Sequence, residues 1–409
     1  MPASKNTPAA RQFFIDWLRI GAFALLVLYH VGMYYVTWDW HVKSPQASAA
    51  LEPLMGLFNP WRMGLLFLVS GAAIGWSLNR GTGNLLAERS VRLLLPLLTG
   101  IVLIVPPQSY YEAVEKFGYA GGYVQFLVLY FQGYGEFCKE SACLHLPTWN
   151  HLWFLPYVWL YTVVFLIVRV VLPVKWRKYA SNWFAARPSW QLWMLPILAL
   201  TVVRLTLLSR YPSTHALIGD RFNHATYGLL FLIGTAFALQ PKLFERLQGL
   251  RWPALVVTLL CWMCISWYVQ HVSALGTVPE DLRVLQRVGY ATMQWSAIVA
   301  VMGFAHRHLN RDHRWRAALS ESVFPLYLLH QTAIVVLAVN LLPLHLNVAA
   351  EATLLVLLVF ATCFAFWRVA RLTGWLRPLF GLPRRMSLAA ALPAPAQGLA
   401  PTTRDGSGN

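Results

Sequence analysis

Long apolar stretches recur along this 409-residue chain. Each is close to the roughly 20 residues that a helix needs to cross a bilayer. Because a lipid-buried backbone must satisfy its own hydrogen bonds, such stretches fold as helices. The sequence therefore predicts an all-α, polytopic integral membrane protein of about ten transmembrane helices. The predicted spans are 13–36, 56–78, 91–107, 151–172, 190–208, 225–240, 252–271, 287–305, 319–342 and 348–367.

The distribution of charge predicts how the chain is oriented. Only 12% of residues are charged, about half the share in soluble domains. The net charge of +17 does not indicate nucleic-acid binding, because apolar runs separate basic residues that such a face would cluster. With the N-terminus in the cytoplasm, 23 of the 33 basic residues fall on cytoplasmic segments and 8 on the opposite loops. This bias follows the positive-inside rule and predicts that both termini are cytoplasmic.

The spans divide the chain into three parts. Residues 1–12 form a cytoplasmic N-terminal segment and 13–370 the membrane domain, whose largest external loop is 108–150. An amphipathic stretch in that loop, Tyr123 to Phe131, is suited to lying along the interface. Residues 371–409 form a cytoplasmic tail that is predicted to be disordered after about 386, where Ala, Pro and Gly dominate.

The cysteines indicate packing more than chemistry. Cys138 and Cys143 fall in the external loop, where an oxidising compartment would allow a disulfide between them. Cys261, Cys264 and Cys363 lie inside apolar spans, where membrane packing is the expected role. We expect no metal site.

Ionisable residues within spans are costly and therefore indicate function. The first span contains Asp16, Arg19 and His30. Eleven positions bring His30 to within about 20° of Arg19 around the helix and about 16 Å further along it. Asp16, three residues before Arg19, is predicted to form an ion pair with it. From spacing alone, His30 is either a catalytic group or a neutral imidazole bonded to the backbone.

The second span begins with Asn59-Pro-Trp-Arg62. If this helix descends from the outer face, Arg62 enters at about the depth that His30 reaches from below, so the two are predicted to share a cavity. The alternative is that Arg62 extends to the outer interface.

Arg89 and Arg92 lie one turn apart where the third span leaves the cytoplasm, close in sequence to Arg80. Guanidinium groups at this spacing suit a phosphate clamp. They would equally serve as positive-inside anchors. The ninth span carries Glu321, Tyr327 and His330, and we expect Glu321 and His330 to point into the helix bundle rather than into lipid.

These residues carry a resemblance to a known family. The first-span residues Asp16, Arg19 and His30, with "FNPWRMGLLFLVSG" at 58–71, "ERSVRLLLPLL" at 88–98, "HLWFLPYVWLY" at 151–161, a Tyr227, Phe231, Gly234 pattern and "YLLHQ" at 327–331, follow one another over about 13–370. Together they resemble the integral-membrane acyltransferase 3 family, and within it the glucan biosynthesis branch. One departure is Gly64, where the family often has proline.

The resemblance implies an O-acyltransferase in a bacterial inner membrane. It implies an acyl-CoA donor, acetyl-CoA or succinyl-CoA, bound from the cytoplasm as co-substrate, with no permanently bound cofactor. It implies a hydroxyl acceptor on a periplasmic glycan, such as a glucan, at the opposite face, with lipid as the remaining partner.

The residues are assigned hypothetical roles on this basis. His30 would act as general base and Arg62 would stabilise the oxyanion. Arg19, Arg89 and Arg92 would hold the phosphates of coenzyme A.

Four residues have two interpretations each. Tyr327 and His330 would line the donor channel or tie helices together by hydrogen bonds. His151 and Trp153 would line the acceptor entrance, or belong to an ordinary interfacial belt.

Two other functions use the same buried charges. A transporter or flippase of a lipid or polysaccharide would place them along its path. A sensor or structural partner of a polysaccharide synthase would tolerate replacement of His30, Arg19 and Arg62 together.

Overall fold

The computed structural model describes residues 12–79, 84–139, 142–272 and 277–383. Most of the predicted N-terminal segment, Arg80 and the predicted tail beyond 383 lie outside the described residues. The α-helices are α1 (Phe13–Tyr35), α2 (Glu52–Phe58), α3 (Arg62–Asn79), α4 (Leu85–Thr99), α5 (Pro106–Phe117), α6 (Tyr123–Gln132), α7 (Phe154–Val171), α8 (Val174–Ala186), α9 (Ser189–Leu207), α10 (Arg221–Leu239), α11 (Lys242–Gly249), α12 (Arg251–His271), α13 (Glu280–His308), α14 (Arg316–Leu341), α15 (Val348–Leu372) and α16 (Leu376–Leu379). Short helical turns η1 (Ala49–Leu51), η2 (Gly100–Ile104), η3 (Asn150–Trp153) and η5 (Leu342–Leu344) and strands β1 (Cys138–Lys139) and β2 (Ala142–Cys143) complete the described part.

The prediction of an all-α, multi-pass membrane protein is confirmed. Nine segments within the described residues are long and apolar enough to cross a membrane, and a bent pair of helices makes up to ten. The nine segments are Phe13–Tyr35, Ala49–Leu78, Asn150–Val171, Ser189–Leu207, Arg221–Leu239, Arg251–His271, Glu280–His308, Arg316–Leu344 and Val348–Leu372.

The third predicted span is the bent one. Leu85–Ile104 and Pro106–Phe117 meet at 46°. Pro96 lies inside α4, and the chain continues through a π-helical turn, η2, before α5 begins. Proline and π turns both disturb the regular helical hydrogen bonds and bend helices. Part of the predicted external loop 108–150 is therefore a continuation of this broken helix.

Helices α3 and α10 approach each other closely at two glycines. A Cβ atom added at Gly71 would fall on the carbonyl oxygen of Phe231, and one added at Gly234 would fall on that of Leu68. The Thr235 hydroxyl adds a hydrogen bond to the Gly71 carbonyl, 3.1 Å away. Small residues let membrane helices approach in this way. This contact fixes α3, which carries Arg62, against α10, which carries Tyr227.

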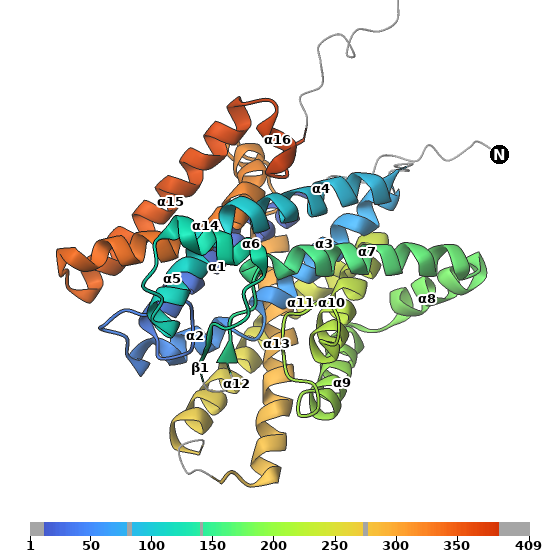
Figure 1. The fold of residues 1–409 in the computed structure, drawn as a ribbon. Coiled ribbons are helices and arrows are strands. Elements are labelled where there is room, and N and C mark those ends of the chain that lie inside the picture. Colours follow the sequence, from blue (N-terminus) through green and yellow to red (C-terminus); the bar gives the residue numbers. More distant parts are fainter. Residues whose placement is uncertain (1–11, 80–83, 140–141, 273–276, 384–409) are drawn as a thin grey trace, which may run out of the picture.

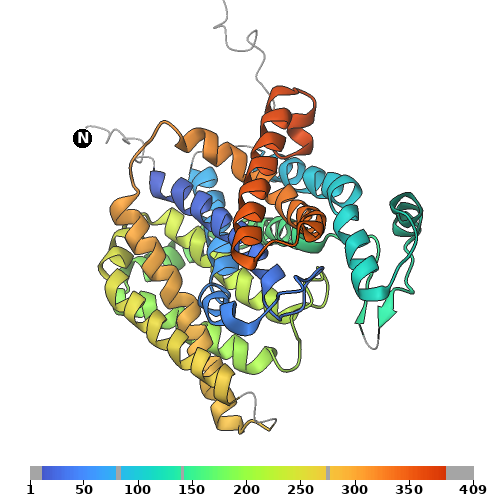
Figure 2. The same cartoon turned by 90° about the vertical axis from the view of Figure 1, so that its left-hand side faces the viewer.

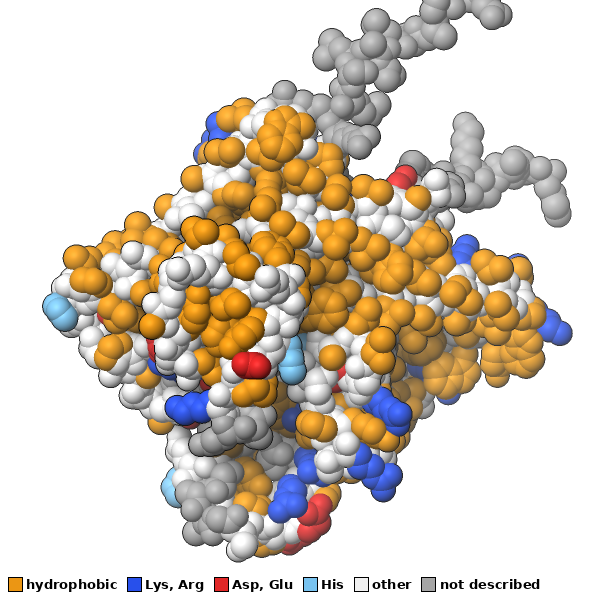
Figure 3. All heavy atoms as spheres, in the orientation of Figure 1, with side chains coloured by type: hydrophobic (Ala, Val, Ile, Leu, Met, Phe, Trp, Pro, Cys, Tyr) orange, Lys and Arg blue, Asp and Glu red, His pale blue; other side chains and the backbone are white. Residues whose placement is uncertain are grey.

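The helix bundle has two ends that differ in the elements gathered there. At one, which we call the basic end, α1, α4 and α14 begin and α15 finishes; it lies in the upper part of Figures 1 and 2. At the other, the cavity end, α1 finishes and α2, η3 and the 208–220 loop gather. Hydrophobic side chains cover the face over α4 and α7 in Figure 3. Such a surface suits contact with lipid.

A small lobe projects beside the cavity end and is seen at the side of the bundle in Figure 2. It consists of α5, α6 and the β1–β2 hairpin, in which a disulfide joins Cys138 to Cys143. Tyr130 anchors the lobe, since its hydroxyl lies 3.0 Å from both the Ile101 and Thr148 carbonyls. Burial raises the pKa of Tyr130 to about 12, so this hydroxyl remains a donor.

Candidate active site

A cavity of about 690 Å³ lies at the cavity end. This volume is within the range, about 300–1,000 Å³, of pockets that bury small-molecule ligands. His30, Arg62, His151, Trp153 and Tyr327 all line it. The structure thus brings together five of the residues singled out in the sequence, including His30 and Arg62 from two different spans.

His30 and His330 form a hydrogen-bonded pair across α1 and α14. His30 Nδ1 lies 2.8 Å from His330 Nε2, and His330 Nδ1 lies 2.7 Å from the carbonyl oxygen of Tyr327. A carbonyl only accepts, so in the neutral pair His330 must donate from Nδ1 and accept at Nε2. His30 must then donate from Nδ1, which leaves Nε2 with its lone pair. His330 is fully buried, and it fixes the tautomer of the histidine that lines the cavity.

Two reciprocal bonds tie η3 to α14. The Tyr327 hydroxyl donates to the His151 carbonyl over 2.7 Å, and His151 Nε2 donates to the Leu328 carbonyl over 3.0 Å. The Tyr327 hydroxyl is therefore engaged between helices, as the helix-tying interpretation expects. His151 Nδ1 is buried and has no partner, so it presents an acceptor.

Arg62 is held from two sides. Its Nη1 donates to Asn59, 2.6 Å to Oδ1 and 3.2 Å to the carbonyl oxygen. Its guanidinium carbon lies 3.4 Å from the centre of the Tyr29 ring. The positive charge of Arg62 acts electrostatically on His30. Arg62 is therefore a fixed cation next to His30 rather than a side chain extended to the membrane surface.

Aromatic rings also line the cavity. Trp153 packs 4.3 Å from His215 and 5.7 Å from Tyr227, measured between ring centres. His151 and Trp153 are 7% and 8% exposed, so they face this cavity and not a lipid belt.

Asp16 and Arg19, which were predicted to pair, interact electrostatically, and each also has a partner on α14. Asp16 lies 2.6 Å from Arg316 of α14. Arg19 donates to the hydroxyl and the carbonyl of Ser320. Spacing within α1 permitted the local pair, but α14 supplies a competing cation and a competing acceptor. Both contacts fix the start of α1 against α14.

Glu321 points into the helix bundle, as expected, and not into lipid. Its carboxylate pairs with Arg371 at 3.2 Å and with Arg377 at 3.1 Å, so it joins α14 to α15 and α16 at the basic end. Glu321 is not among the residues that line the cavity.

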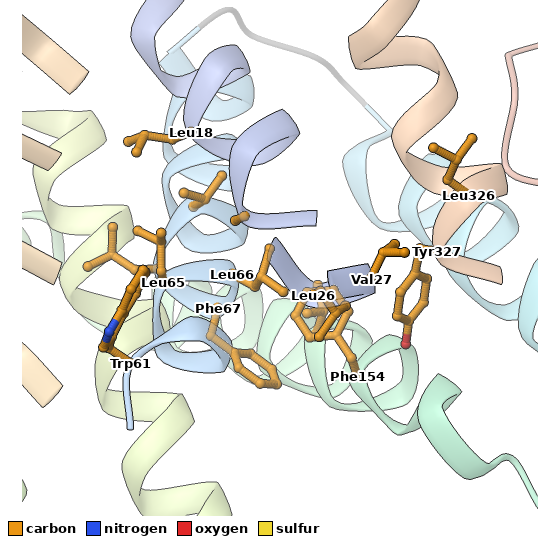
Figure 4. Close-up of a cluster of buried hydrophobic side chains, with 14 of the residues drawn as sticks. Leu18, Leu26, Val27, Trp61, Leu65, Leu66, Phe67, Phe154, Leu326 and Tyr327 are labelled. Carbon is orange, nitrogen blue, oxygen red and sulfur yellow. The ribbon is translucent and has the colours of Figure 1, made fainter. Parts of the chain in front are cut away.

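Arg89 and Arg92 lie close to Arg19 at the basic end. The three guanidinium groups repel one another electrostatically. None of the three lines the 690 Å³ cavity. Figure 4 shows side chains of α1, α3, α7 and α14 filling the interior, with Leu26 beside Phe154 and Val27 beside Tyr327. The cationic cluster therefore lies at the basic end of the bundle, and the cavity that His30 lines lies at the cavity end.

Comparison of the sequence with known protein families identifies the family of this chain. The family model described as an acyltransferase domain, Acyl_transf_3, matches residues 12–368. The chain belongs to the acyltransferase 3 family. The matched region includes both the basic-end arginines and the cavity.

Glucans biosynthesis proteins are similar to this chain over only part of their length. The chain is 30% identical over 108 residues to proteins named glucans biosynthesis protein C from Salmonella paratyphi B (strain ATCC BAA-1250 / SPB7) and Salmonella heidelberg (strain SL476). The match covers 25% of this chain and 27% of each relative, so it spans about a quarter of their length. No solved structure matches the chain.

This member of the acyltransferase 3 family also has cavity residues that the sequence did not single out. His41 donates from Nδ1 to Glu112, and Gln331 donates to His41 Nε2. Lys116 lies 3.1 Å from Glu112 and 2.8 Å from Asp39. His41 and Glu112 belong to predicted loops, where no span made their charge conspicuous. Among the described residues, no group of His, Cys, Asp and Glu has an arrangement that could hold a metal ion.

Proposed function

We propose that this protein is an O-acyltransferase that moves an acyl group from acyl-CoA to a hydroxyl group of a glycan. The observation that carries the proposal is the His30–His330 pair, in which the bond to Tyr327 leaves His30 Nε2 as a proton acceptor beside the cavity. A general base must lie within hydrogen-bond reach of the proton that it removes. A hydroxyl bound in the cavity next to His30 meets this requirement.

The reaction is an acyl transfer in which all atoms balance. His30 Nε2 takes the proton of the acceptor hydroxyl while its oxygen attacks the thioester carbonyl carbon. The tetrahedral intermediate collapses as the carbon–sulfur bond breaks. The proton on His30 passes to the departing thiolate, so the products are an ester and free coenzyme A, and His30 regains its neutral form.

Arg62 is the proposed stabiliser of the oxyanion. Fixed donors aimed at developing negative charge supply a large share of catalysis. The contacts with Asn59 and Tyr29 hold the guanidinium in place before the reaction, so little reorganisation is needed when the charge develops.

The donor is proposed to bind from the basic end. Coenzyme A carries several phosphates, and Arg19, Arg89 and Arg92 form a cationic cluster there. Arg19 and His30 share α1, about 16 Å apart along the helix. The positive-inside bias supports the basic end as the cytoplasmic side. A bacterial inner membrane is the proposed location because the partial relatives are bacterial proteins.

The acceptor is proposed to be an envelope glycan, for which a glucan is the first candidate because of the name of the partial relatives. Trp40, Trp149 and Trp153 line the cavity, and flat aromatic surfaces pack well on apolar ligand faces.

The test is transfer by the purified protein in detergent or nanodiscs. Radiolabelled acetyl-CoA and succinyl-CoA are each offered with a panel of glucose oligosaccharides. The parent protein should label a glycan, and His30→Gln should lower the rate by roughly 10²–10⁴-fold, the usual contribution of a general base. His271→Gln is the matched control, because His271 is exposed on α12 and bonds only within its own helix.

Two results would contradict the proposal. If the parent protein neither binds acyl-CoA nor labels a glycan, yet moves lipid or glycan across vesicles, it is a transporter. If His30→Gln keeps the full rate, the base is another residue.

A further inference from the structure

Arg204 of α9 is a cation within the cavity wall that the proposed reaction does not use. It lines the same cavity as His30 and lies in the apolar span Ser189–Leu207. A charged side chain within a spanning helix is costly, although the cost is smaller one turn from the end of the helix than at its centre. A cation retained at such a cost needs a counter-charge or a function.

The described residues do not pair Arg204 with a carboxylate. The two carboxylates that line the cavity, Asp39 and Glu112, are both bonded to Lys116. Asp220 lies nearby, but its Oδ2 accepts from the Tyr157 hydroxyl at 2.7 Å and from the His215 backbone at 2.8 Å. None of these three carboxylates forms an ion pair with Arg204, although the buried Oδ1 of Asp220 has no hydrogen-bond partner among the described residues.

Aromatic contacts hold the Arg204 guanidinium in place without neutralising it. Its central carbon lies 3.6 Å from the ring centre of Tyr290 and 5.7 Å from that of Phe222. Cation–π contacts stabilise such a group by about 0.5–2 kcal/mol. The positive charge remains available to a ligand.

Further hydrogen-bond donors gather around Arg204. Tyr227 interacts electrostatically with Arg204 and Arg62, and also with Tyr290. Gln294 follows Tyr290 by one turn of α13, and both line the cavity with Tyr227. Guanidinium, phenol and amide donors on one wall match the acceptor oxygens of a carboxylate or a phosphate.

The position of Arg204 separates it from the reacting atoms. The Arg204 guanidinium packs on Tyr290 of α13 and Phe222 of α10, whereas His30 is bonded to His330 of α14. Arg204 lies one turn before the end of α9, next to the 208–220 loop, whose Ser213, Thr214 and His215 also line the cavity. An anion bound there belongs to a part of the ligand away from the reacting hydroxyl.

We propose that the acceptor is an acidic glycan, and that Arg204, with Tyr227, Tyr290 and Gln294, binds a carboxylate or phosphate on a sugar unit next to the one that is acylated. This inference rests on the proposed acyltransferase function and names the chemical class of its acceptor. The cavity of about 690 Å³ is large enough for more than the reacting sugar.

The experiment compares two matched acceptors. One is a disaccharide of glucose, and the other has glucuronic acid in place of one glucose; a third disaccharide with a phosphate substituent tests the other oxyanion. The measured quantity is the ratio of kcat/KM for the acidic acceptor to that for the neutral one. The parent protein should favour an acidic acceptor at least tenfold, and Arg204→Gln should reduce the ratio to about one.

Three further variants separate binding from folding. Arg204→Lys retains the charge and should keep part of the preference. Tyr290→Phe keeps the ring over Arg204 but removes one donor, and should lower the ratio by about 2- to 10-fold, the effect of one net hydrogen bond. Arg283→Gln is the matched control, since Arg283 is half-exposed and pairs with Glu280 at the start of α13; it should leave the ratio unchanged. Thermal melting shows whether Arg204→Gln is folded. If it is not, the ratio of kcat/KM measured for Tyr290→Phe tests the proposal.

Several outcomes would contradict the acidic-acceptor proposal or the acyltransferase function on which it rests. A parent protein that labels both acceptors equally, or an Arg204→Gln variant that keeps the acidic preference, overturns the acidic-acceptor proposal while leaving the acyltransferase function standing. If Arg204→Gln changes the choice between succinyl-CoA and acetyl-CoA instead, the anion is on the acyl group, and the proposal is likewise wrong. If no acceptor is labelled, the acyltransferase proposal fails, and quenching of the cavity tryptophans by the same disaccharides still measures whether Arg204 selects an acidic glycan.

Discussion

Replacing His330 tests whether the histidine pair, and not His30 alone, forms the catalytic base. His330→Leu preserves much of the buried volume but removes the acceptor that receives the His30 Nδ1 proton, 2.8 Å away. His30 then leaves a buried donor unpaired, or adopts the other tautomer and presents an N–H group to the hydroxyl. The first state keeps the lone pair at Nε2 but carries the cost of the unpaired donor, and the second has no lone pair facing the hydroxyl.

The size of the effect follows from the lost hydrogen bond. Leaving a buried donor without its partner costs about 1–3 kcal/mol. If this cost falls on the productive tautomer, kcat decreases roughly 5- to 150-fold, since each 1.36 kcal/mol is a factor of ten. KM for acyl-CoA should change little, because the cationic cluster at the basic end is untouched.

His330→Gln distinguishes positioning from packing. The glutamine carbonyl reaches about as far as His330 Nε2 and accepts a hydrogen bond from His30 Nδ1, so it should restore most of the rate. The assay is steady-state transfer of radiolabelled acyl groups across pH 5–9, with thermal melting as a control. In the leucine variant the pH–rate profile should change together with kcat, whereas the glutamine profile should follow the parent. If the leucine and glutamine variants have equal rates at equal stability, His330 does not position the base.

The remaining predictions concern the oxyanion, the donor and the helix packing. Arg62→Met should lower kcat by about 10²–10³-fold, the effect of removing one oxyanion donor, while Arg62→Lys recovers part of it; equal losses would contradict the oxyanion role. Arg89→Gln combined with Arg92→Gln should raise KM for acyl-CoA at least tenfold, since hydrogen bonds to charged groups contribute about 1.5–3 kcal/mol each; an unchanged KM would move the donor site elsewhere. Gly71→Ala should cost about 1–3 kcal/mol of stability by overpacking α3 against α10, measured by thermal melting, whereas Gly21→Ala, whose new methyl meets nothing within 4 Å, should not.

Hydropathy was sufficient to predict the membrane architecture because the bilayer imposes a length on every crossing. It did not predict the broken third span, since Pro96 and the π-helical turn act on helix geometry and leave the apolar run intact. Helical spacing also placed Arg19 and His30 on one face of α1. Both inferences depend on short-range rules, which a single segment contains in full.

The partners of the site residues depended on long-range packing. His330 and Arg316 are each 300 residues away from the α1 residue that they contact. Spacing showed that Asp16 could reach Arg19, but not that Arg316 would compete for the same carboxylate. His41 and Glu112 gave no signal, because a charged residue in a loop is unremarkable until the fold encloses it.

The two ends of α1 explain why one helix carries so much of the proposed chemistry. Arg19 is fixed to Ser320 and His30 to His330, and both partners lie on α14. The cationic cluster and the base are therefore held at a constant separation by a pair of helices bonded at both levels. A donor anchored by its phosphates at the basic end would present its thioester at a depth set by that separation. The side chains that fill the interior between the two levels, such as Phe23 against Tyr327, would have to part for the donor arm and would close behind it. On this reasoning, the helix pair sets the reach of the donor, and the interior packing keeps water from the thioester until an acceptor occupies the cavity.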